Sequence, residues 1–195
     1  MTAPTLALPP GGRSQPRNTP TFGALVLVVA GAMAVGTLSA VFMALSFRAH
    51  QPPSGVRLDE YPAVVAGLTL ILSSVTITWA LYGLRLGERR QAMAALTATL
   101  LFGLADVSLV WFILAQAGFG VASSPFATLF YALVGTGGLL VAMGLVMVAG
   151  CIGKVAGNQL NAFEGEGLRA VLWYWHFAVG AWIVISLTIY PVVKL

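Results

Sequence analysis

The segment that decides the fold is AVLWYWHFAVGAWIVISLTIYPV, at residues 170–192, which contains no Asp, Glu, Lys or Arg. A helix needs about 20 apolar residues to cross ~30 Å of hydrocarbon, so this segment is long enough to span a bilayer. Similar stretches lie at about 22–47, 61–84, 92–116 and 126–152. Because a helix satisfies its own backbone groups in lipid, the sequence predicts an all-α integral membrane bundle of five transmembrane helices.

The composition supports a membrane protein. Of 195 residues, 58% are hydrophobic and 8% charged, and the mean hydropathy is +0.90, whereas a soluble domain carries about 25% charged residues. The net charge of +4 does not indicate nucleic-acid binding, because the basic residues lie at the ends of apolar segments. The single cysteine, Cys151, excludes an internal disulfide and a thiolate metal cluster on this chain alone.

Residues 1–21 contain five prolines and two glycines, and we expect a disordered cytoplasmic tail. The alternative of a cleaved signal peptide is disfavoured, because the following run at 22–47 exceeds the usual core of about 7–15 residues. The domain prediction is therefore a tail at 1–21 and a five-helix transmembrane domain at 22–195.

The basic residues predict the orientation. One side of the predicted bundle holds seven: Arg13, Arg17, Arg85, Arg89, Arg90, Lys154 and Arg169. The other side holds three: Arg48, Arg57 and Lys194. Cytoplasmic loops carry the excess of Lys and Arg, so we expect the N-terminus in the cytoplasm and the C-terminus outside.

Loop lengths predict neighbours. The loops at 85–91 and 117–125 are short, so the second, third and fourth helices should pack as antiparallel neighbours. The longer loop at 153–169 carries Glu164 and Glu166 and is a candidate cytoplasmic contact surface. We find no internal repeat, which argues against a transporter built from repeated halves.

The run Trp173-Tyr174-Trp175-His176-Phe177 opens the last helix and is its most specific chemical feature. His176 lies about six residues into that predicted helix, on the order of 9 Å from its cytoplasmic end. A proton-transfer group or a heme ligand is one interpretation. A hydrogen-bonded histidine near the lipid headgroups, within an aromatic belt, is the favoured one. The only other histidine, His50, falls in an outer loop, so we do not expect this chain alone to ligate heme.

Asp106 is the only acidic residue deep in a predicted helix, about 14 residues past Ala92 and roughly 21 Å in. Intramembrane carboxylates are costly, which raises a proton relay as one hypothesis. A protonated Asp hydrogen-bonded to a neighbouring helix or partner subunit is the other. One isolated acid does not make a proton path, so we favour the second.

Hydroxyl and small residues predict close helix packing. The segment Ser73-Ser74-Val75-Thr76-Ile77-Thr78 predicts hydrogen bonds between helices. Small residues recur every fourth position at Ala32, Gly36, Ala40 and Ala44, which lets a second backbone approach from inside or outside this chain. Gly135, Gly137 and Gly138 lack the context of a phosphate loop and predict close helix or lipid contact.

In order along residues 60–195, these motifs resemble subunit III of heme-copper terminal oxidases, in the short bacterial form with five helices. The last-helix signature of that family is similar to the run Trp173–Phe177 followed by Trp182. Its segment of small and hydroxyl residues ending in Trp-Ala resembles Ser73–Ala80, with Trp79 at the matching position. The basic loop Gly87–Arg90 and the aromatic stretch Trp111–Gln116 follow at the family's spacing.

The chain departs from the family at its polar positions. Two histidines common in the family are absent from the segment 134–141, and Val179 stands where an Asp is common. The stretch at 22–47 holds no acid, although the family's helix usually carries a glutamate there. Glu164 and Glu166 lie several residues upstream of the usual glutamate position, and Asp106 matches no family carboxylate. The family's role of stabilising the catalytic subunit does not depend on these side chains.

The resemblance implies a non-catalytic, cofactor-free subunit packed against catalytic subunit I, with subunit II nearby, in a proton-pumping oxidase that reduces oxygen to water. Heme and copper would lie on the partners, and phospholipid would bind this chain. The implied roles are to stabilise the core, bind lipid and support proton uptake in a bacterial plasma membrane. Contacts with lipid or between helices are expected from Trp173, Tyr174, Trp175, His176, Trp182 and Trp79. The alternatives are an accessory subunit of a nitric oxide reductase and a small independent transporter.

Overall fold

The computed structural model describes residues 19–46, 58–157 and 166–194. These residues form five α-helices and no strand. The helices are α1 (Thr19–Ser46), α2 (Tyr61–Arg85), α3 (Arg89–Ala115), α4 (Pro125–Ala156) and α5 (Glu166–Lys194). Each contains a span long and apolar enough to cross a membrane. The predicted all-α bundle of five membrane helices is confirmed.

Several helices run past the apolar stretches that predicted them. α3 begins at Arg89, three residues earlier than expected, α4 continues to Ala156, and α5 begins at Glu166. Hydropathy detects only the part of a helix that can enter hydrocarbon, whereas the backbone hydrogen bonds continue into polar residues at either end. Part of the expected loop at 153–169 is therefore helical, and Glu164 lies outside the described residues.

Local signals set two of the boundaries. The side chain of Ser124 accepts a hydrogen bond from the backbone N–H of Ala127 at 3.1 Å, and Pro125 follows at the first helical position of α4. This is the usual way to satisfy a free N–H group at a helix start. Gly87 has a φ of 76°, which allows the tight turn between α2 and α3.

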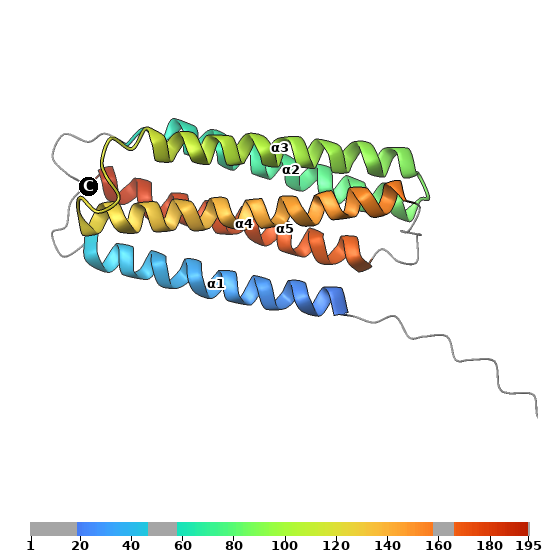
Figure 1. Ribbon diagram of the computed structural model, residues 1–195, viewed down its shortest axis with the longest axis horizontal. Coiled ribbons are helices and arrows are strands. Elements are labelled where there is room, and N and C mark those ends of the chain that lie inside the picture. Colours follow the sequence, from blue (N-terminus) through green and yellow to red (C-terminus); the bar gives the residue numbers. More distant parts are fainter. Residues whose placement is uncertain (1–18, 47–57, 158–165, 195) are drawn as a thin grey trace, which may run out of the picture.

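Four helices form a closed ring and the fifth lies outside it (Figure 1). α2 packs against α3 and α5, and α4 packs against α3 and α5. α1 packs on α4 and α5, on the side away from the α2–α3 hairpin. The short loops do join antiparallel neighbours, as the sequence predicted.

The ring encloses most of the buried core. Large and fully buried side chains in this core include Trp175, Trp182 and Phe130. The outward positions are as apolar as the buried ones: Trp111 and Val146 are each 74% exposed. Such a surface suits contact with lipid or with a second protein, because apolar side chains are unfavourable in water.

Candidate functional site

The aromatic run in α5 divides between two faces of the helix. Tyr174 and Trp175 are 0% and 1% exposed, whereas Trp173 is 64% exposed and His176 also lies on the surface. Successive residues of an α-helix turn by about 100°, so a five-residue run cannot present one face. The run is therefore both a packing element inside the bundle and an outward-facing surface.

Trp175 lies at the centre of the ring and contacts all three of the other ring helices. Its indole Nε1 donates to the Ser73 hydroxyl on α2 at 2.9 Å, and that hydroxyl donates to the Leu70 carbonyl at 2.6 Å. A Cβ added at Gly103 of α3 or at Gly144 of α4 would lie 2.8 Å from the ring of Trp175. Both glycines are therefore required by the indole, a role that no sequence motif indicated.

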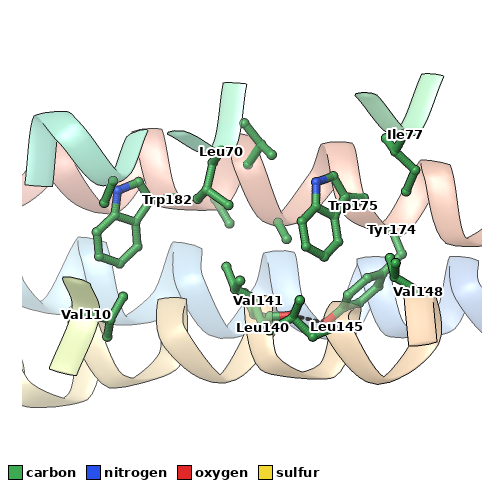
Figure 2. Close-up of a cluster of buried hydrophobic side chains, with 14 of the residues drawn as sticks. Leu70, Ile77, Val110, Leu140, Val141, Leu145, Val148, Tyr174, Trp175 and Trp182 are labelled. Atoms are coloured by element: carbon green, nitrogen blue, oxygen red, sulfur yellow. Dashed lines mark hydrogen bonds between the residues drawn. The ribbon is translucent and has the colours of Figure 1, made fainter. Parts of the chain in front are cut away.

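Two turns further along α5, Trp182 repeats this arrangement. Its Nε1 donates to the Ala63 carbonyl of α2 at 3.3 Å, and a Cβ at Gly137 of α4 would lie 2.8 Å from its ring. Figure 2 shows both indoles from α5 lying between side chains of α2 and α4. The expected helix contacts of Gly137 and Gly138 are present, since Gly138 packs on Val110 of α3.

Tyr174 and Phe177 face the other side of α5. The Tyr174 hydroxyl donates to the Leu140 carbonyl of α4 at 2.9 Å, drawn as a dashed line in Figure 2. A Cβ at Gly31 of α1 would lie 2.7 Å from the ring of Phe177. These two side chains join α5 to α4 and α1.

Hydroxyl side chains of α2 make two of the expected bonds between helices. Ser73 accepts from Trp175, and the Thr76 and Thr99 hydroxyls lie 2.7 Å apart across the α2–α3 contact. Thr78 instead donates to the Ser74 carbonyl of its own helix. Ser73 and Thr76 thus link α2 to both of its neighbours.

His176 lies on the outward face of α5, one turn after Trp173. Its Nδ1 lies 2.8 Å from the Leu172 carbonyl of the same helix. Because α5 begins at Glu166, His176 lies ten residues into the helix, deeper than the expected six. The structure does not bring His176 together with the buried indoles.

Asp106 is 0% exposed and lies on the face of α3 that lines the ring. It follows Gly103, which packs on Trp175, and precedes Val110, which packs on Gly138. Neither carboxyl oxygen has a hydrogen-bond partner among the described residues. The carboxyl therefore points into the bundle, toward other helices of this chain.

Trp79 and the small-residue stripe face outward. Trp79 is 50% exposed on α2 and lies apart from the aromatic run of α5. The stripe of Ala32, Gly36, Ala40 and Ala44 is exposed along α1. Within the described chain it has no covering helix, so any neighbour of this stripe lies outside the described residues.

Two apolar grooves open on the surface. One, of about 480 Å³, lies between α2 and α5 and is lined by residues that include Gly67, Ile183 and Leu187. The other, of about 410 Å³, lies between α1, α4 and α5, with Gly23, Gly150 and Gly167 in its wall. Lys154 also lines the second groove, so that groove combines apolar walls with one cation.

The described residues contain no group of three or more His, Cys, Asp or Glu side chains that could hold a metal ion. His50, the second histidine, lies outside the described residues. The fold and the packing of its aromatics define an integral membrane helical bundle.

Comparison with known proteins identifies the family. The model of the cytochrome c oxidase subunit III family matches residues 22–193. Cytochrome c oxidase subunit 3 of Scyliorhinus canicula is 32% identical over 141 residues, and that of Polypterus ornatipinnis is 33% identical over 141 residues. Each match covers 71% of this chain and 54% of the relative, so the chain spans about half the length of these curated relatives. The chain belongs to the cytochrome c oxidase subunit III family.

Proposed function

We propose that this chain is a non-catalytic subunit III of a proton-pumping heme-copper oxidase of aerobic respiration, a complex that reduces oxygen to water. The observation that carries the proposal is the family match across residues 22–193. The buried aromatics support a scaffold role, because Trp175 and Trp182 make packing and hydrogen-bond contacts within the bundle. The main partner would be the catalytic subunit I, with subunit II nearby.

In this proposal the heme and copper are bound by partner subunits. The chain has two histidines and one cysteine. His176 lies on the outer face of α5, whereas Cys151 is buried. These two side chains are therefore not placed to bind the same metal ion. The contribution of this chain is to hold the catalytic subunit in a stable form, and so to sustain its turnover and proton uptake.

Phospholipid is the proposed ligand of the groove between α1, α4 and α5. Its glycines have open space where a Cβ would lie, which lets an acyl chain approach the backbone at Gly23 and Gly150. Lys154 at this groove is an ammonium group that can pair with a lipid phosphate. This end of the bundle also carries Arg85 and Arg169.

The proposed orientation keeps this basic end in the cytoplasm. The end of α2, the start of α3 and the end of α4 meet there, and the Arg89 guanidinium donates to the Ala156 carbonyl. Asp59 and Glu60 lie at the opposite end, before α2. A bacterial plasma membrane is the proposed location and rests on the likeness to the short bacterial form; the relatives named above are animals.

The experiment is to tag this chain, solubilise native membranes gently and purify what the tag retains. The reduced-minus-oxidised heme spectrum, the copper content and oxygen consumption are then measured, with an untagged strain as control. Heme and copper together with oxygen uptake are expected. Heme with non-heme iron and nitric oxide reduction would favour an accessory subunit of a nitric oxide reductase. A colourless chain, from a preparation that keeps other complexes intact, would contradict the proposal and favour a transporter.

A further inference from the structure

The groove between α2 and α5 occupies one half of the membrane span. Its wall on α2 runs from Glu60 to Ile71, and its wall on α5 runs from Trp182 to Pro191. The α2 wall rises about 16.5 Å along the helix axis, which is close to half of the ~30 Å hydrocarbon core. The groove therefore covers the depth of one leaflet.

One end of this groove coincides with the ends of two apolar spans. The membrane span of α2 begins at Tyr61, directly after Glu60, and the span of α5 ends at Pro191. Both Glu60 and Pro191 line the groove, and we call this end its mouth. Because charged residues begin where the two apolar spans stop, the mouth lies at the membrane surface and the groove extends from it into the leaflet.

Polar side chains line the groove near its mouth. Glu60 supplies a carboxylate there, and Tyr190 and Ser186 supply hydroxyl groups. Of these three residues Ser186 lies deepest, about 7.5 Å along α5 from Pro191. The polar groups thus belong to the part of the groove that meets the headgroup region.

The deeper part of the groove is apolar. Its walls include Leu68 and Ile71 of α2 and Ile183 of α5. The Trp182 indole also lines this part, but its Nε1 donates to the Ala63 carbonyl at 3.3 Å, so its one N–H group is already bonded. The polarity of the groove therefore falls with depth, as it does along a phospholipid.

The extent of the groove favours a lipid over a helix of another protein. A transmembrane helix would contact both leaflets, whereas the groove stops at Ile71 and α2 continues to Arg85. The volume of about 480 Å³ lies within the usual range of about 300–1,000 Å³ for small-molecule sites. One acyl chain, entering from the mouth, fits this shape.

The charges around the mouth select the headgroup. Asp59 Oδ1 accepts a hydrogen bond from the Tyr61 N–H at 3.0 Å, which holds a second carboxylate beside Glu60. α5 ends at Lys194, so a basic residue belongs to the same end of the bundle, and Arg57 lies outside the described residues. Carboxylates attract an ammonium group, and a basic residue attracts a phosphate. Both signs together suit a zwitterionic headgroup.

We propose that the groove between α2 and α5 binds one phosphatidylethanolamine molecule, with its ammonium group at Glu60 and an acyl chain along Gly67 and Ile71. This site is distinct from the groove between α1, α4 and α5, where Lys154 offers only a cation and which opens at the opposite end of the bundle. The proposed orientation places the phosphatidylethanolamine in the outer leaflet.

The test counts the lipids that the purified complex retains for each copy of this chain. A Cβ at Gly67 would lie 3.7 Å from Trp182, an ordinary contact, so Gly67→Leu fills the groove without a backbone clash. Lipid mass spectrometry should find one phosphatidylethanolamine fewer per chain in Gly67→Leu than in wild type. The matched control is Gly150→Leu in the other groove, where a Cβ would meet nothing within 4 Å, and it should keep this lipid.

Two further measurements do not depend on the folding of Gly67→Leu. Glu60→Gln keeps the shape and removes the charge, so it should lower the retained phosphatidylethanolamine by about twofold to fivefold and leave phosphatidylglycerol unchanged. The photo-crosslinking amino acid p-benzoylphenylalanine, in place of the lining residue Leu187, should capture phosphatidylethanolamine.

Three results would overturn the proposal. They are equal phosphatidylethanolamine in wild type and Gly67→Leu, loss of phosphatidylglycerol instead of phosphatidylethanolamine in that variant, and capture of a protein from position 187. Absence of heme from the complex would instead refute the proposed function, because the lipid count is made per copy of this chain and does not depend on the partner subunits.

Discussion

Gly144 of α4 packs closely against two aromatic rings of α5. A Cβ there would lie 2.8 Å from Trp175 and 3.3 Å from Tyr174. Gly144→Ala should therefore lower the free energy of unfolding by about 1–3 kcal/mol, as overpacking does in well-packed cores. Thermal unfolding of the purified protein, followed by intrinsic tryptophan fluorescence, measures the change.

Gly135→Ala is the matched control for Gly144→Ala. It lies on the same helix, and its Cβ would meet nothing within 4 Å. Alanine favours helix over glycine by about 1 kcal/mol, so this variant should be unchanged or slightly stabilised. Equal destabilisation by both substitutions would contradict the assigned role of Trp175.

The substitution Asp106→Asn tests whether the Asp106 carboxyl is the neutral acid. A buried carboxyl without an ionic partner is least costly as the neutral acid, and Asn is nearly the same shape as that form. Asp106→Asn should leave the free energy of unfolding within about 1 kcal/mol of wild type, measured by thermal unfolding. Loss of assembly in Asp106→Asn would show that the ionised carboxylate has a partner beyond the described residues.

At the scale of the helices, the sequence predicted how many there are but not which faces they bury. Each helix is apolar all round, because its outer face meets lipid or protein, so hydropathy does not separate Trp175 from Trp173. The glycines at 103 and 144 likewise carry no local signal, since their role depends on an indole from another helix. The inward direction of Trp175 and the outward direction of His176 follow only from the tertiary arrangement.

The helix outside the ring, α1, should be the easiest to loosen. Phe42 is 1% exposed, and its ring lies 5.3 Å from that of Phe126 on α4, centroid to centroid. Phe42→Ala removes this contact, a change that typically costs about 3–5 kcal/mol in a packed core. Amide hydrogen exchange should therefore become faster in α1, while α3 keeps its protection.

Phe22→Ala is the control within the same helix, since Phe22 is 68% exposed. It should leave the exchange of α1 unchanged. If Phe42→Ala accelerated exchange equally in all helices, α1 would be an integral part of one cooperative unit, contrary to this account.

For the whole molecule, the sequence was sufficient to predict the membrane bundle and the family, because both depend on features read along the chain. Long apolar stretches define the spans, and the run Trp173–Phe177 with Trp182 carries the family likeness. The site could be predicted only in part: the aromatic residues were identified, but their division into an internal packing set and an outward face was not.

We propose that this chain supports a catalytic subunit without contributing to its metal centres. The most direct measurement compares the purified complex before and after selective removal of this chain, recording the heme spectrum and the time course of oxygen consumption. The account predicts an unchanged heme spectrum and a turnover that decays sooner once the chain is gone. Loss of a heme band on removal, or turnover that persists unchanged, would contradict it.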